Sequence, residues 1–578
     1  MVFTPASVAG TLPPIPDNIP ISEFMLSEGN GRYPLSKARH PFTCGLTGKT
    51  YSTLEVRDRV EHLSRAVGKL LDWDPNRGSE WDKTLVIFSL NTIDTLPLAW
   101  ATHELGGIVS PASAAYSAPE LKHQLLDSKA KALFTCVPLL PTALEAASAA
   151  GLPKERIYLI DVLPGGGKIP AQYKTVSQLV EAGKSLPKLE KTKWRAGEAA
   201  RRAAFLCYSS GTSGLPKGVM ISHRNVIANV LQMTAFEKSW RDSQKTADGS
   251  YYTDVLLGLL PQSHIYGLVV MCHCGPFRGD QVVVLPRFEL GTYLKAVQNF
   301  KISTLFVVPP IIINMLRSPE ACAKYDLSSA RALVTGAAPL GEETAVDFQK
   351  AYPGVKIRQA YGLTETATVV TCTHYDDIVF GSSGWLVPGV EARIVTPEGV
   401  EVNEYDTPGE LWLKSPSVVL GYLNNVKATK ETFSDGWMHT GDEAVIRKSS
   451  KGIEHVYIVD RIKELIKVKG HQVAPAELEA HLLTHPAVAD CAVIAIPDDA
   501  AGEVPKAIVT KSPEAGSDDE ATIKAIVKHV QDHKARHKWL KGGVRFIDAV
   551  PKSPSGKILR RLLRDQEAAM RRQGGPKL

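Results

Sequence analysis

Short apolar runs that end in turn residues recur along most of this 578-residue chain, and helical patterns separate them. The apolar run at 83–90 is followed by an amphipathic stretch from Thr92 to Leu105 and then by the run "GGIVSP". A strand, a helix and a second strand in this order form a unit whose strands are parallel. The same rhythm returns at "DVLLGLLP", "QVVVLP", "STLFVVPP", "ARALVTG" and "VKIRQAYG". The chain is therefore predicted to be an α/β protein, with stacked α/β subdomains built on mostly parallel sheet.

The sequence pattern changes twice towards the C-terminus. Between about 385 and 460, the alternating segments "GVEARIVTPEG" and "GELWLKSPS" predict a small antiparallel β unit. Beyond the charged stretch 459–470, a compact α+β segment is predicted from helices at 474–483 and 522–533 and from the strands "CAVIAIPD" and "KAIVTK". A chain of this length exceeds one hydrophobic core. We therefore predict a large N-terminal domain, 1–460, and a small mobile C-terminal domain, 461–578, with a short charged hinge near 461.

Composition favours a soluble globular protein, with 44% hydrophobic and 22% charged residues. The net charge of +6 is spread along the chain, so nucleic-acid binding is not predicted. No run of about 18 apolar residues occurs, and the first residues lack the basic and apolar regions of a signal peptide. A transmembrane segment and a secretory leader are therefore not expected.

The eight cysteines are scattered and contain no CxxC pair, which predicts reduced, buried thiols in a non-secreted protein. Cys272, His273 and Cys274 form the one cluster. As a metal site it lacks a second pair of ligands at a usable spacing. We interpret it as part of the core or of a pocket wall.

A segment dense in hydrogen-bond donors, "YSSGTSGLPKGVMISHRN", runs from Tyr208 to Asn225 between an apolar run and a probable helix. It is not a Walker A motif, because Gly211 is not followed at the required spacing by Gly-Lys-Ser/Thr. Successive backbone N–H groups of a Gly/Ser turn can still form an anion-binding nest. Lys217 adds a positive charge suited to a leaving pyrophosphate. A surface linker would also explain the glycines and serines, but the flanking elements favour phosphate binding.

A second group of polar residues lies in "RQAYGLTETATVV", at 358–370. The Glu365 carboxylate beside the Thr364 hydroxyl would suit a magnesium ion that bridges phosphates. Tyr361 offers an aromatic face to a purine. The same residues would equally suit an ordinary helix cap.

Three further motifs follow in the C-terminal third of the chain. In "GWMHTGDEAVI", Asp442 is placed to accept two vicinal hydroxyls such as those of ribose, or it is a turn residue. The charged stretch "VDRIKELIKVKGHQV" could be one solvated helix face, although Val468, Gly470 and Val473 break helical spacing. The loop in "PKSPSGKILRR" delivers Lys557 just before a C-terminal helix, or belongs to a basic tail. Each motif alone has a second interpretation. The occurrence of all of them in this order between 208 and 561 is a far more specific signal than any one of them.

In this order, the motifs resemble those of the adenylate-forming superfamily of acyl-CoA synthetases, adenylation domains and beetle luciferases. "SSGTSGLPKGV" is similar to its phosphate loop, "YGLTE" to its fifth core motif, "GWMHTGD" to its ribose motif, "VDRIKELIKVKG" to its hinge and "SPSGK" to its catalytic lysine loop. The resemblance spans roughly residues 40–565. Within the superfamily, the chain resembles the 4-coumarate–CoA ligase-like group and, inside it, the fungal phenylacetyl-CoA ligases, which are peroxisomal.

The resemblance implies an ATP-dependent acid–CoA ligase with two steps. The acid attacks the α-phosphate of Mg·ATP to form an acyl-adenylate and pyrophosphate, and the thiol of coenzyme A then attacks the acyl carbon. An arylacetic acid such as phenylacetate, or a medium-chain fatty acid, is the expected substrate. The alternatives are a hydroxycinnamate–CoA ligase, an enzyme that passes the acyl group to another acceptor such as a carrier protein, a luciferase-type oxygenase, and a non-catalytic nucleotide-binding scaffold. A scaffold would be expected to have lost Lys557, Glu365 or Asp442, and all three are present.

The resemblance also assigns roles to individual residues. The expected nucleotide-binding residues are Ser209, Ser210, Gly211, Thr212, Ser213, Lys217, Ala337, Gln359, Tyr361, Gly362, Asp442, Arg461, Lys463 and Lys467. The expected catalytic residues are Lys557, His264, Thr364 and Glu365, of which Glu365 takes the magnesium. The expected coenzyme A contacts are Arg287, Lys469 and Gly470, and the expected acyl pocket is formed by Tyr266, Gly336 and Val369.

Within these sets the implied roles differ. Ser209 to Thr212 hold the phosphates with Lys217, while Ala337, Gln359 and Tyr361 wall the adenine. Asp442 and Arg461 hold the ribose, Thr364 touches the α-phosphate and His264 gates or orients the acyl carboxylate. Lys557 reaches the reacting oxygens in the first step. Rotation about Lys463 then brings Lys469 and Gly470 to coenzyme A.

Two departures from the plant coumarate ligases bear on the acid. The segment "GELWLKS" at 409–415 keeps only the Gly-Glu start of their Gly-Glu-Ile-Cys-Ile-Arg-Gly box, and Ala367-Thr368 replaces a Gly-Pro pair. Both differences argue against a hydroxycinnamate specialist. The last three residues, Pro576-Lys577-Leu578, resemble the Ser-Lys-Leu address of peroxisomal proteins. The expected location is therefore the peroxisomal matrix, reached through the import receptor, with the cytoplasm as the alternative.

Overall fold

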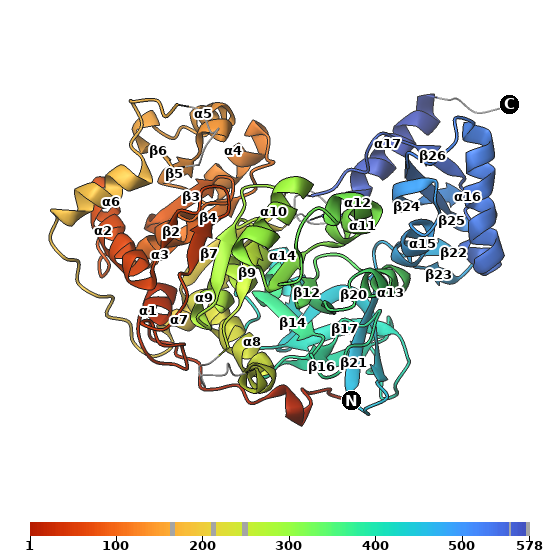
Figure 1. Ribbon diagram of the computed structural model, residues 1–578, viewed down its shortest axis with the longest axis horizontal. Coiled ribbons are helices and arrows are strands. Elements are labelled where there is room, and N and C mark those ends of the chain that lie inside the picture. The colour runs from red at the N-terminus through yellow and green to blue at the C-terminus, as the bar shows by residue number, and fades with distance from the viewer. Residues whose placement is uncertain (162–167, 210–215, 245–251, 554–555, 574–578) are drawn as a thin grey trace.

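The computed structural model describes residues 1–161, 168–209, 216–244, 252–553 and 556–573 (Figure 1). In these residues, four β-sheets and the helices around them form a mixed α/β architecture, as the sequence predicts. Ser210, Gly211, Thr212 and Ser213 of the phosphate-loop motif and the C-terminal tripeptide 576–578 lie outside the described residues.

The first sheet has the strand order β18-β8-β7-β4-β3-β5-β6. Its strands are β3 (Thr84–Phe88), β4 (Ile108–Ala112), β5 (Ala132–Thr135), β6 (Ile157–Leu159), β7 (Ala203–Ser209), β8 (Lys217–Ser222) and β18 (Gly421–Tyr422). The strands from β7 to β6 are parallel, and β8 and β18 add an antiparallel edge. The associated helices include α2 (Thr53–Leu71), α3 (Thr95–Glu104), α4 (Ala118–Asp127), α5 (Leu140–Ala149) and α6 (Val176–Lys184).

The second sheet has the order β15-β14-β13-β12-β11-β9-β10-β1-β2. Its strands are β1 (Phe42–Cys44), β2 (Thr50–Tyr51), β9 (Val255–Gly258), β10 (Gln281–Val284), β11 (Thr304–Val307), β12 (Ala332–Thr335), β13 (Lys356–Leu363), β14 (Thr368–Cys372) and β15 (Trp385–Leu386). The strands from β13 to β1 are parallel, as the apolar runs predict. Its helices include α8 (His223–Ser243), α10 (Leu290–Phe300), α11 (Pro309–Arg317), α13 (Glu342–Ala351) and a π-helix (Tyr266–Cys274).

The third sheet is the antiparallel unit predicted between about 385 and 460. It contains β16 (Glu391–Val395), β17 (Gly409–Lys414), β19 (Phe433–Ser434), β20 (Trp437–Lys448) and β21 (Glu454–Arg461). The fourth sheet contains β22 (Ile466–Val468), β23 (His471–Val473), β24 (Val488–Asp498), β25 (Gly502–Lys511) and β26 (Val544–Phe546). Around it lie α15 (Pro475–Leu482), α16 (Asp519–His533) and α17 (Arg560–Gln573).

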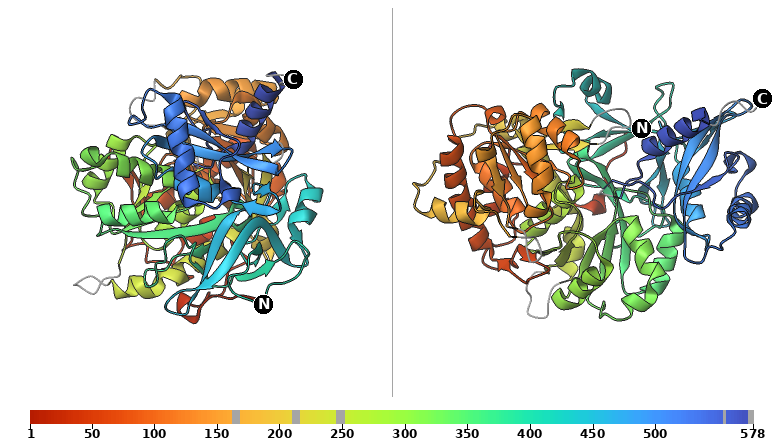
Figure 2. Two further views of the ribbon diagram at one scale, coloured as in Figure 1. Left: turned by 90° about the vertical axis from the view of Figure 1, so that its right-hand side faces the viewer. Right: turned by 90° about the horizontal axis from the view of Figure 1, so that it is seen from above.

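Buried apolar residues divide near the predicted hinge. The main apolar cluster runs from Phe3 to Val456, and a separate cluster runs from Ile466 to Leu563. The segment around the second cluster, here called the C-terminal domain, lies at one end of the molecule (Figure 2). It stands beside the β16–β21 sheet, because α15 contacts β21. The chain passes from the main cluster to the second cluster through the short turn between β21 and β22.

Three local features differ from what the sequence patterns indicated. The stretch after the Gly/Ser loop begins as strand β8 and becomes helix α8 only at His223, because Lys217–Ser222 finds hydrogen-bond partners in β7 and Ser222 caps the helix. Helix α3 is not amphipathic, since every residue from Thr95 to His103 is buried. The charged stretch 459–473 is not a helix face either: it forms the end of β21 and the hairpin of β22 and β23.

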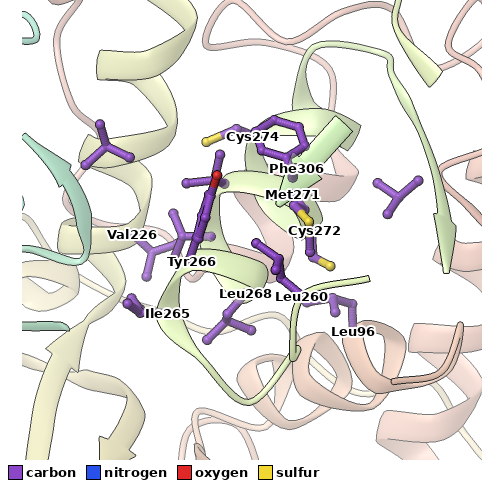
Figure 3. Packing of buried hydrophobic residues seen from close by; sticks show 14 of the residues in the cluster. Leu96, Val226, Leu260, Ile265, Tyr266, Leu268, Met271, Cys272, Cys274 and Phe306 are labelled. Atoms are coloured by element: carbon purple, nitrogen blue, oxygen red, sulfur yellow. The ribbon is translucent and has the colours of Figure 1, made fainter. Parts of the chain in front are cut away.

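All eight cysteines are free and buried, which confirms the predicted thiols. Cys272 and Cys274 belong to the π-helix and pack in the main core near Phe306 and Met271 (Figure 3). Their neighbour His273 accepts a hydrogen bond of 3.1 Å from the Trp100 indole. The core interpretation of this cluster is therefore confirmed. None of the described helices has the length and apolar composition needed to cross a membrane.

Candidate active site

A cavity of about 690 Å³ lies where the two large sheets, the β16–β21 sheet and the C-terminal domain meet. Its walls hold these predicted site residues: Ser209, Lys217, His264, Tyr266, Gly336, Ala337, Tyr361, Gly362, Thr364, Glu365, Val369, Arg461, Lys463 and Lys557. Several come from the ends of parallel strands, which is where ligands gather in open α/β sheets. Residues that are more than 300 positions apart in the sequence therefore share one chamber.

Glu365 is the central carboxylate of this cavity. It lies on a 3-10 turn, Thr364–Thr366, immediately after β13, and is 9% exposed. Its Oε1 accepts hydrogen bonds from the Tyr422 hydroxyl at 2.9 Å and from Ser209 Oγ at 3.3 Å. Glu365 forms no ion pair with any described residue. A buried carboxylate whose hydrogen bonds from described side chains all come from hydroxyl groups suits a hard divalent cation such as Mg²⁺, which prefers oxygen ligands.

Lys217 lies beside this carboxylate as the first residue of β8. It pairs in register with Ser209, the last residue of β7, so the two residues mark the base of one hairpin. The Lys217 ammonium lies 5.0 Å from the centre of the Tyr422 ring, a distance at which cation and aromatic face attract. Lys217 thus presents a positive charge to the cavity from a fixed strand end.

Asp442 and Arg461 are cross-strand partners on β20 and β21. Asp442 Oδ2 accepts a hydrogen bond of 2.6 Å from the Tyr361 hydroxyl, and Arg461 Nε lies 3.6 Å from Oδ1. Burial raises the pKa of Asp442, and the charge of Arg461 opposes that rise. Asp442 itself stands just behind the wall, while the neighbouring Thr440 and Gly441 line the cavity.

Lys557 enters the same cavity from the C-terminal domain. Its backbone N–H donates to Ser553 Oγ at 3.1 Å, and the Ser553 N–H donates to the carbonyl of Lys557 at 2.8 Å. Burial, helped by the charge of Arg461, lowers the pKa of Lys557 to about 8, and carboxylates including Glu464 oppose the shift. The lysine therefore loses its charge far more readily than a solvated lysine does.

Arg560 anchors the lysine loop at the start of α17. It donates to Glu464 at 2.5 Å and to Glu479 at 2.6 Å. Glu464 belongs to the turn between β21 and β22, and Glu479 belongs to α15. One guanidinium thus ties the lysine loop to the hinge turn and to the body of the C-terminal domain.

His264 and Tyr266 form the opposite end of the cavity. Burial, together with the charge of Lys557, lowers the pKa of His264 to about 4, so its ring is neutral at pH 7. The Tyr266 hydroxyl donates to the carbonyl of Val334 at 3.1 Å, and its ring meets Phe306 nearly edge-on, with centroids 6.1 Å apart. Figure 3 shows Tyr266 among apolar side chains of the core. This end suits an apolar group beside a neutral hydrogen-bonding ring.

The backbone is crowded where β13 and β14 pair antiparallel, beside a register shift between Tyr361 and Gly362. A Cβ on Gly362 would lie 1.6 Å from the carbonyl oxygen of Thr368, so only glycine fits. Ala367 and Thr368, the pair that departs from the plant pattern, have φ angles of 48° and 122°. Positive φ is costly for a β-branched residue and is often found at binding sites.

Other predicted residues lie outside the cavity wall. Gln359 is fixed on β13, where its backbone exchanges hydrogen bonds with Thr373. Lys467, Lys469 and Gly470 are exposed on the β22–β23 hairpin, and Arg287 is exposed after β10. In this arrangement, Lys557 rather than the predicted coenzyme A face is turned to the cavity.

Tyr422 and Lys552 are among the cavity residues to which the sequence analysis assigned no role. Tyr422 lies 57 positions after Glu365 in the sequence and donates a hydrogen bond to its carboxylate. No local sequence pattern identifies Tyr422 as a site residue. Lys552 lines the cavity and forms an ion pair of 2.7 Å with Asp490. The sequence signal that could have identified Lys552 is its position in the Pro/Ser/Gly loop that also carries Lys557.

Two family models cover most of the chain. One, described as AMP-binding enzyme, matches residues 40–423, and the other, described as AMP-binding enzyme C-terminal domain, matches residues 477–557. The chain belongs to the AMP-binding enzyme family. These matches include every cavity motif from Ser209 to Lys557 except the segment around Asp442 and Arg461, which lies between them.

Fungal members of the AMP-binding enzyme family match along nearly the whole chain. Acyl-CoA ligase easD of Emericella nidulans is 39% identical over 571 residues, which are 98% of this chain and 100% of that protein. Acyl-CoA ligase cm3C of Cordyceps militaris is 38% identical over 98% of this chain and 91% of its own length. The chain is therefore an adenylating enzyme of the acyl-CoA ligase type.

Solved structures confirm the fold expected of the AMP-binding enzyme family. The ATP-bound MatB of Rhodopseudomonas palustris superposes with a TM-score of 0.76 at 25% identity, covering 95% of this chain and 99% of that one. The anthranilate CoA ligase AuaEII, in complex with anthranoyl-AMP, gives a TM-score of 0.79 at 23% identity and covers 96% and 99%. The predicted fold class is thereby confirmed.

Proposed function

We propose that this enzyme joins a carboxylic acid to coenzyme A at the expense of ATP, by way of an acyl-adenylate. The single observation that carries the proposal is that Lys557 and His264 share one cavity with Glu365, although they come from three distant segments. Acyl transfer through an adenylate needs a cation near the reacting oxygens, an acidic group for the metal–phosphate complex and an uncharged site for the acyl group. This cavity contains all three.

In the first step, an oxygen of the substrate carboxylate attacks the α-phosphorus, and the bond from that phosphorus to the pyrophosphate oxygen breaks. Negative charge spreads over the phosphoryl oxygens, so positioned donors lower the barrier. Lys557 and Thr364 serve as these donors, and Lys217 stabilises the departing pyrophosphate. Mg²⁺ bound through Glu365 would supply further neutralisation of the phosphate charge.

In the second step, the sulfur of coenzyme A attacks the acyl carbon, AMP leaves with the bonding electron pair, and the thiol proton is lost. Lys469, Gly470 and Arg287 are the residues assigned to coenzyme A. Lys469 and Gly470 belong to the C-terminal domain and lie outside the cavity here, so the step requires rotation of that domain about Lys463. Gating by rotation lets one acyl pocket serve both reactions.

The proposed acid has an apolar, uncharged tail, with phenylacetate as the first choice and a medium-chain fatty acid as the second. Tyr266, Ile265 and Val369 supply apolar surface at the His264 end of the cavity, and Gly336 leaves room beside the Tyr266 ring. The neutral His264 can donate a hydrogen bond to the carboxylate without neutralising the attacking oxygen.

The test is pyrophosphate release with Mg·ATP and a panel of phenylacetate, hydroxycinnamates and fatty acids of graded length, each with and without coenzyme A. We expect turnover that requires coenzyme A, a thioester product and the highest kcat/KM for an uncharged aryl or medium-chain acid. Equal turnover without coenzyme A would point to another acceptor. Release with none of these acids, or equally from Lys557→Ala, would contradict the proposal.

For location, we propose the peroxisomal matrix, with residues 576–578 as the address. A fluorescent fusion that keeps a free C-terminus is expected to give punctate fluorescence that coincides with a peroxisomal marker. Removal of Pro576-Lys577-Leu578 should make it diffuse. An unchanged punctate pattern after removal would contradict the tripeptide as the address.

A further inference from the structure

Four histidines gather on two packed helices of the C-terminal domain. His481 is on α15 and His485 follows four positions later, just beyond the end of that helix. His529 and His533 are four positions apart on α16, so both project from the same side of it. The two helices contact each other (Figure 1), and none of the four histidines lines the cavity.

Three of the rings converge closely. His481 and His529 are stacked with centroids 4.2 Å apart and planes 3° from parallel, and the His533 ring centroid is 5.2 Å from each of them. Ring nitrogens of these three residues lie within 4.8 Å of one another. Among the described residues, this is the one group of three or more histidine, cysteine or acidic side chains that meets this separation.

In each of the three rings, one nitrogen has a hydrogen-bond partner and the other has none among the described residues. Nε2 of His529 contacts the Thr484 hydroxyl at 3.0 Å and the carbonyl oxygen of His481 at 3.3 Å. Nε2 of His481 at 3.2 Å and Nδ1 of His533 at 2.9 Å both approach one backbone acceptor, the carbonyl oxygen of His529. None of the three rings forms an ion pair with a described carboxylate, and the nearby Asp532 is paired with Lys528. Protonation would therefore place like charges together without an acidic partner, whereas neutral imidazoles offer lone pairs to a cation.

We propose that His481, His529 and His533 form a site for a borderline divalent metal ion, of which Zn²⁺ is the type, with His485 or water as the remaining ligand. Histidines at i and i+4 on a helix, with further histidines from a neighbouring segment, are a ligand arrangement that Zn²⁺ and its neighbours bind. The ligand nitrogens of a tetrahedral Zn²⁺ lie about 3.4 Å apart when each is about 2.1 Å from the metal. His529 and His533 are more exposed than His481, so theirs are the rings expected to turn when the group contracts around an ion.

Metal binding here would join α15 to α16. Two residues before His481 on α15 lies Glu479, which receives a hydrogen bond of 2.6 Å from Arg560 at the start of α17. The ion would therefore restrain the helix that anchors the Lys557 loop, while touching no residue of the cavity. Its expected effect is on the stability of the C-terminal domain.

The test uses the full-length protein, freed of metal with a chelator, at a pH above the ordinary pKa of histidine. Zn²⁺ alone is titrated by calorimetry, and Co²⁺ is used as a spectroscopic probe, because tetrahedral Co²⁺ absorbs strongly in the visible range. We expect one equivalent of metal to bind and to raise the Tm. His533→Gln and the double variant His529→Gln/His533→Gln should each weaken binding by at least about tenfold, and the double variant more than the single one.

The matched control is His537→Gln. His537 stacks on His471 in the same domain with centroids 4.4 Å apart, and no third histidine ring of the described residues joins that pair. This variant is expected to bind Zn²⁺ as the unchanged chain does. Absence of saturable binding, or an equal loss in His537→Gln and His533→Gln, would overturn the proposal. Unaltered pyrophosphate release shows that each variant is folded, and because His533 is exposed its replacement does not disturb the core.

Discussion

The hydroxyl of Tyr422 donates a hydrogen bond of 2.9 Å to Oε1 of Glu365. Tyr422 ends β18 at the edge of the first sheet, whereas Glu365 follows β13 of the second sheet. Ser209, from β7, donates to the same oxygen at 3.3 Å. The position of the carboxylate assigned to magnesium is therefore fixed by contacts from both large sheets.

Replacement of Tyr422 by phenylalanine should weaken the binding of Mg·ATP. The variant loses a hydrogen bond to a charged acceptor, typically about 1.5–3 kcal/mol, so KM for Mg·ATP should rise by about tenfold or more. Tyr405→Phe is the control, because its hydroxyl donates to Glu454 at 2.6 Å outside the cavity. Steady-state kinetics at varied Mg²⁺ check this; similar KM values for the two variants would contradict the role given to Tyr422.

Lys557→Ala should separate the two proposed steps. Loss of one positioned donor typically lowers a rate by about 10²–10³, so acid-dependent pyrophosphate release should fall by that factor. Thioester formation from a supplied acyl-adenylate should stay within a few-fold, because this step uses the rotated domain. Lys541→Ala, on an exposed lysine of the same domain, should leave both steps intact. Equal losses in the two steps would show that Lys557 is not specific to the first.

The first step should lose rate as the pH rises through about 8, the pKa to which burial brings Lys557. The charged lysine is the active form, so its deprotonation removes the donor cation. Lys557→Arg keeps its charge and should lack this alkaline loss, although its geometry lowers the rate overall. A pH profile of pyrophosphate release at saturating substrates checks this, and an identical alkaline limb in Lys557→Arg would assign the titration to another group.

The same shift predicts how stability depends on pH. The pKa of Lys557 falls from 10.5 to about 8 on folding, so between these values the unfolded chain binds more protons than the folded one. The free energy of unfolding contributed by this group should therefore rise with pH across that interval. Denaturant unfolding of the unchanged chain and of Lys557→Met, compared at several pH values, measures the difference. A contribution that falls with rising pH would contradict the assigned direction.

Gly362→Ala should disable the site through the backbone. Its Cβ would lie 1.6 Å from the carbonyl oxygen of Thr368, so β13 and β14 would have to separate beside Glu365. Overpacking of this kind costs about 1–3 kcal/mol or more. Gly354→Ala is the control, since nothing lies within 4 Å of its Cβ position. Thermal unfolding and pyrophosphate release check both variants; a Tm for Gly362→Ala equal to that of the control would be inconsistent with the crowding.

Much of the fold followed from local sequence patterns, because parallel strands are short apolar runs with clear ends. The prediction for Ala118–Asp127 coincides with α4. Strand β8 was missed because its pairing with β7 depends on a tertiary contact, and apolar periodicity alone does not separate such a run from a helix. The burial of α3 on every side likewise depends on neighbours that its own sequence does not specify.

The motifs placed most of the cavity residues, since each combines turn-forming residues with hydroxyl or charged side chains over a short stretch of sequence. Tyr422 has no such context, and its role comes from the meeting of two sheets. The exposure of Lys469 and Gly470 depends on how the C-terminal domain is turned relative to the large sheets, which no local pattern records. Their assignment to coenzyme A stays a prediction.

The placement of Lys557 inside the cavity, with Lys469 and Gly470 facing solvent, bears on turnover. If a cross-link across the hinge locked the molecule in this arrangement, it would still form the acyl-adenylate. It could not then transfer the acyl group to coenzyme A. It would act as a stoichiometric reagent, releasing one pyrophosphate per chain in a burst and then stopping. The lifetime of the stranded intermediate would then report how well the closed chamber keeps out water.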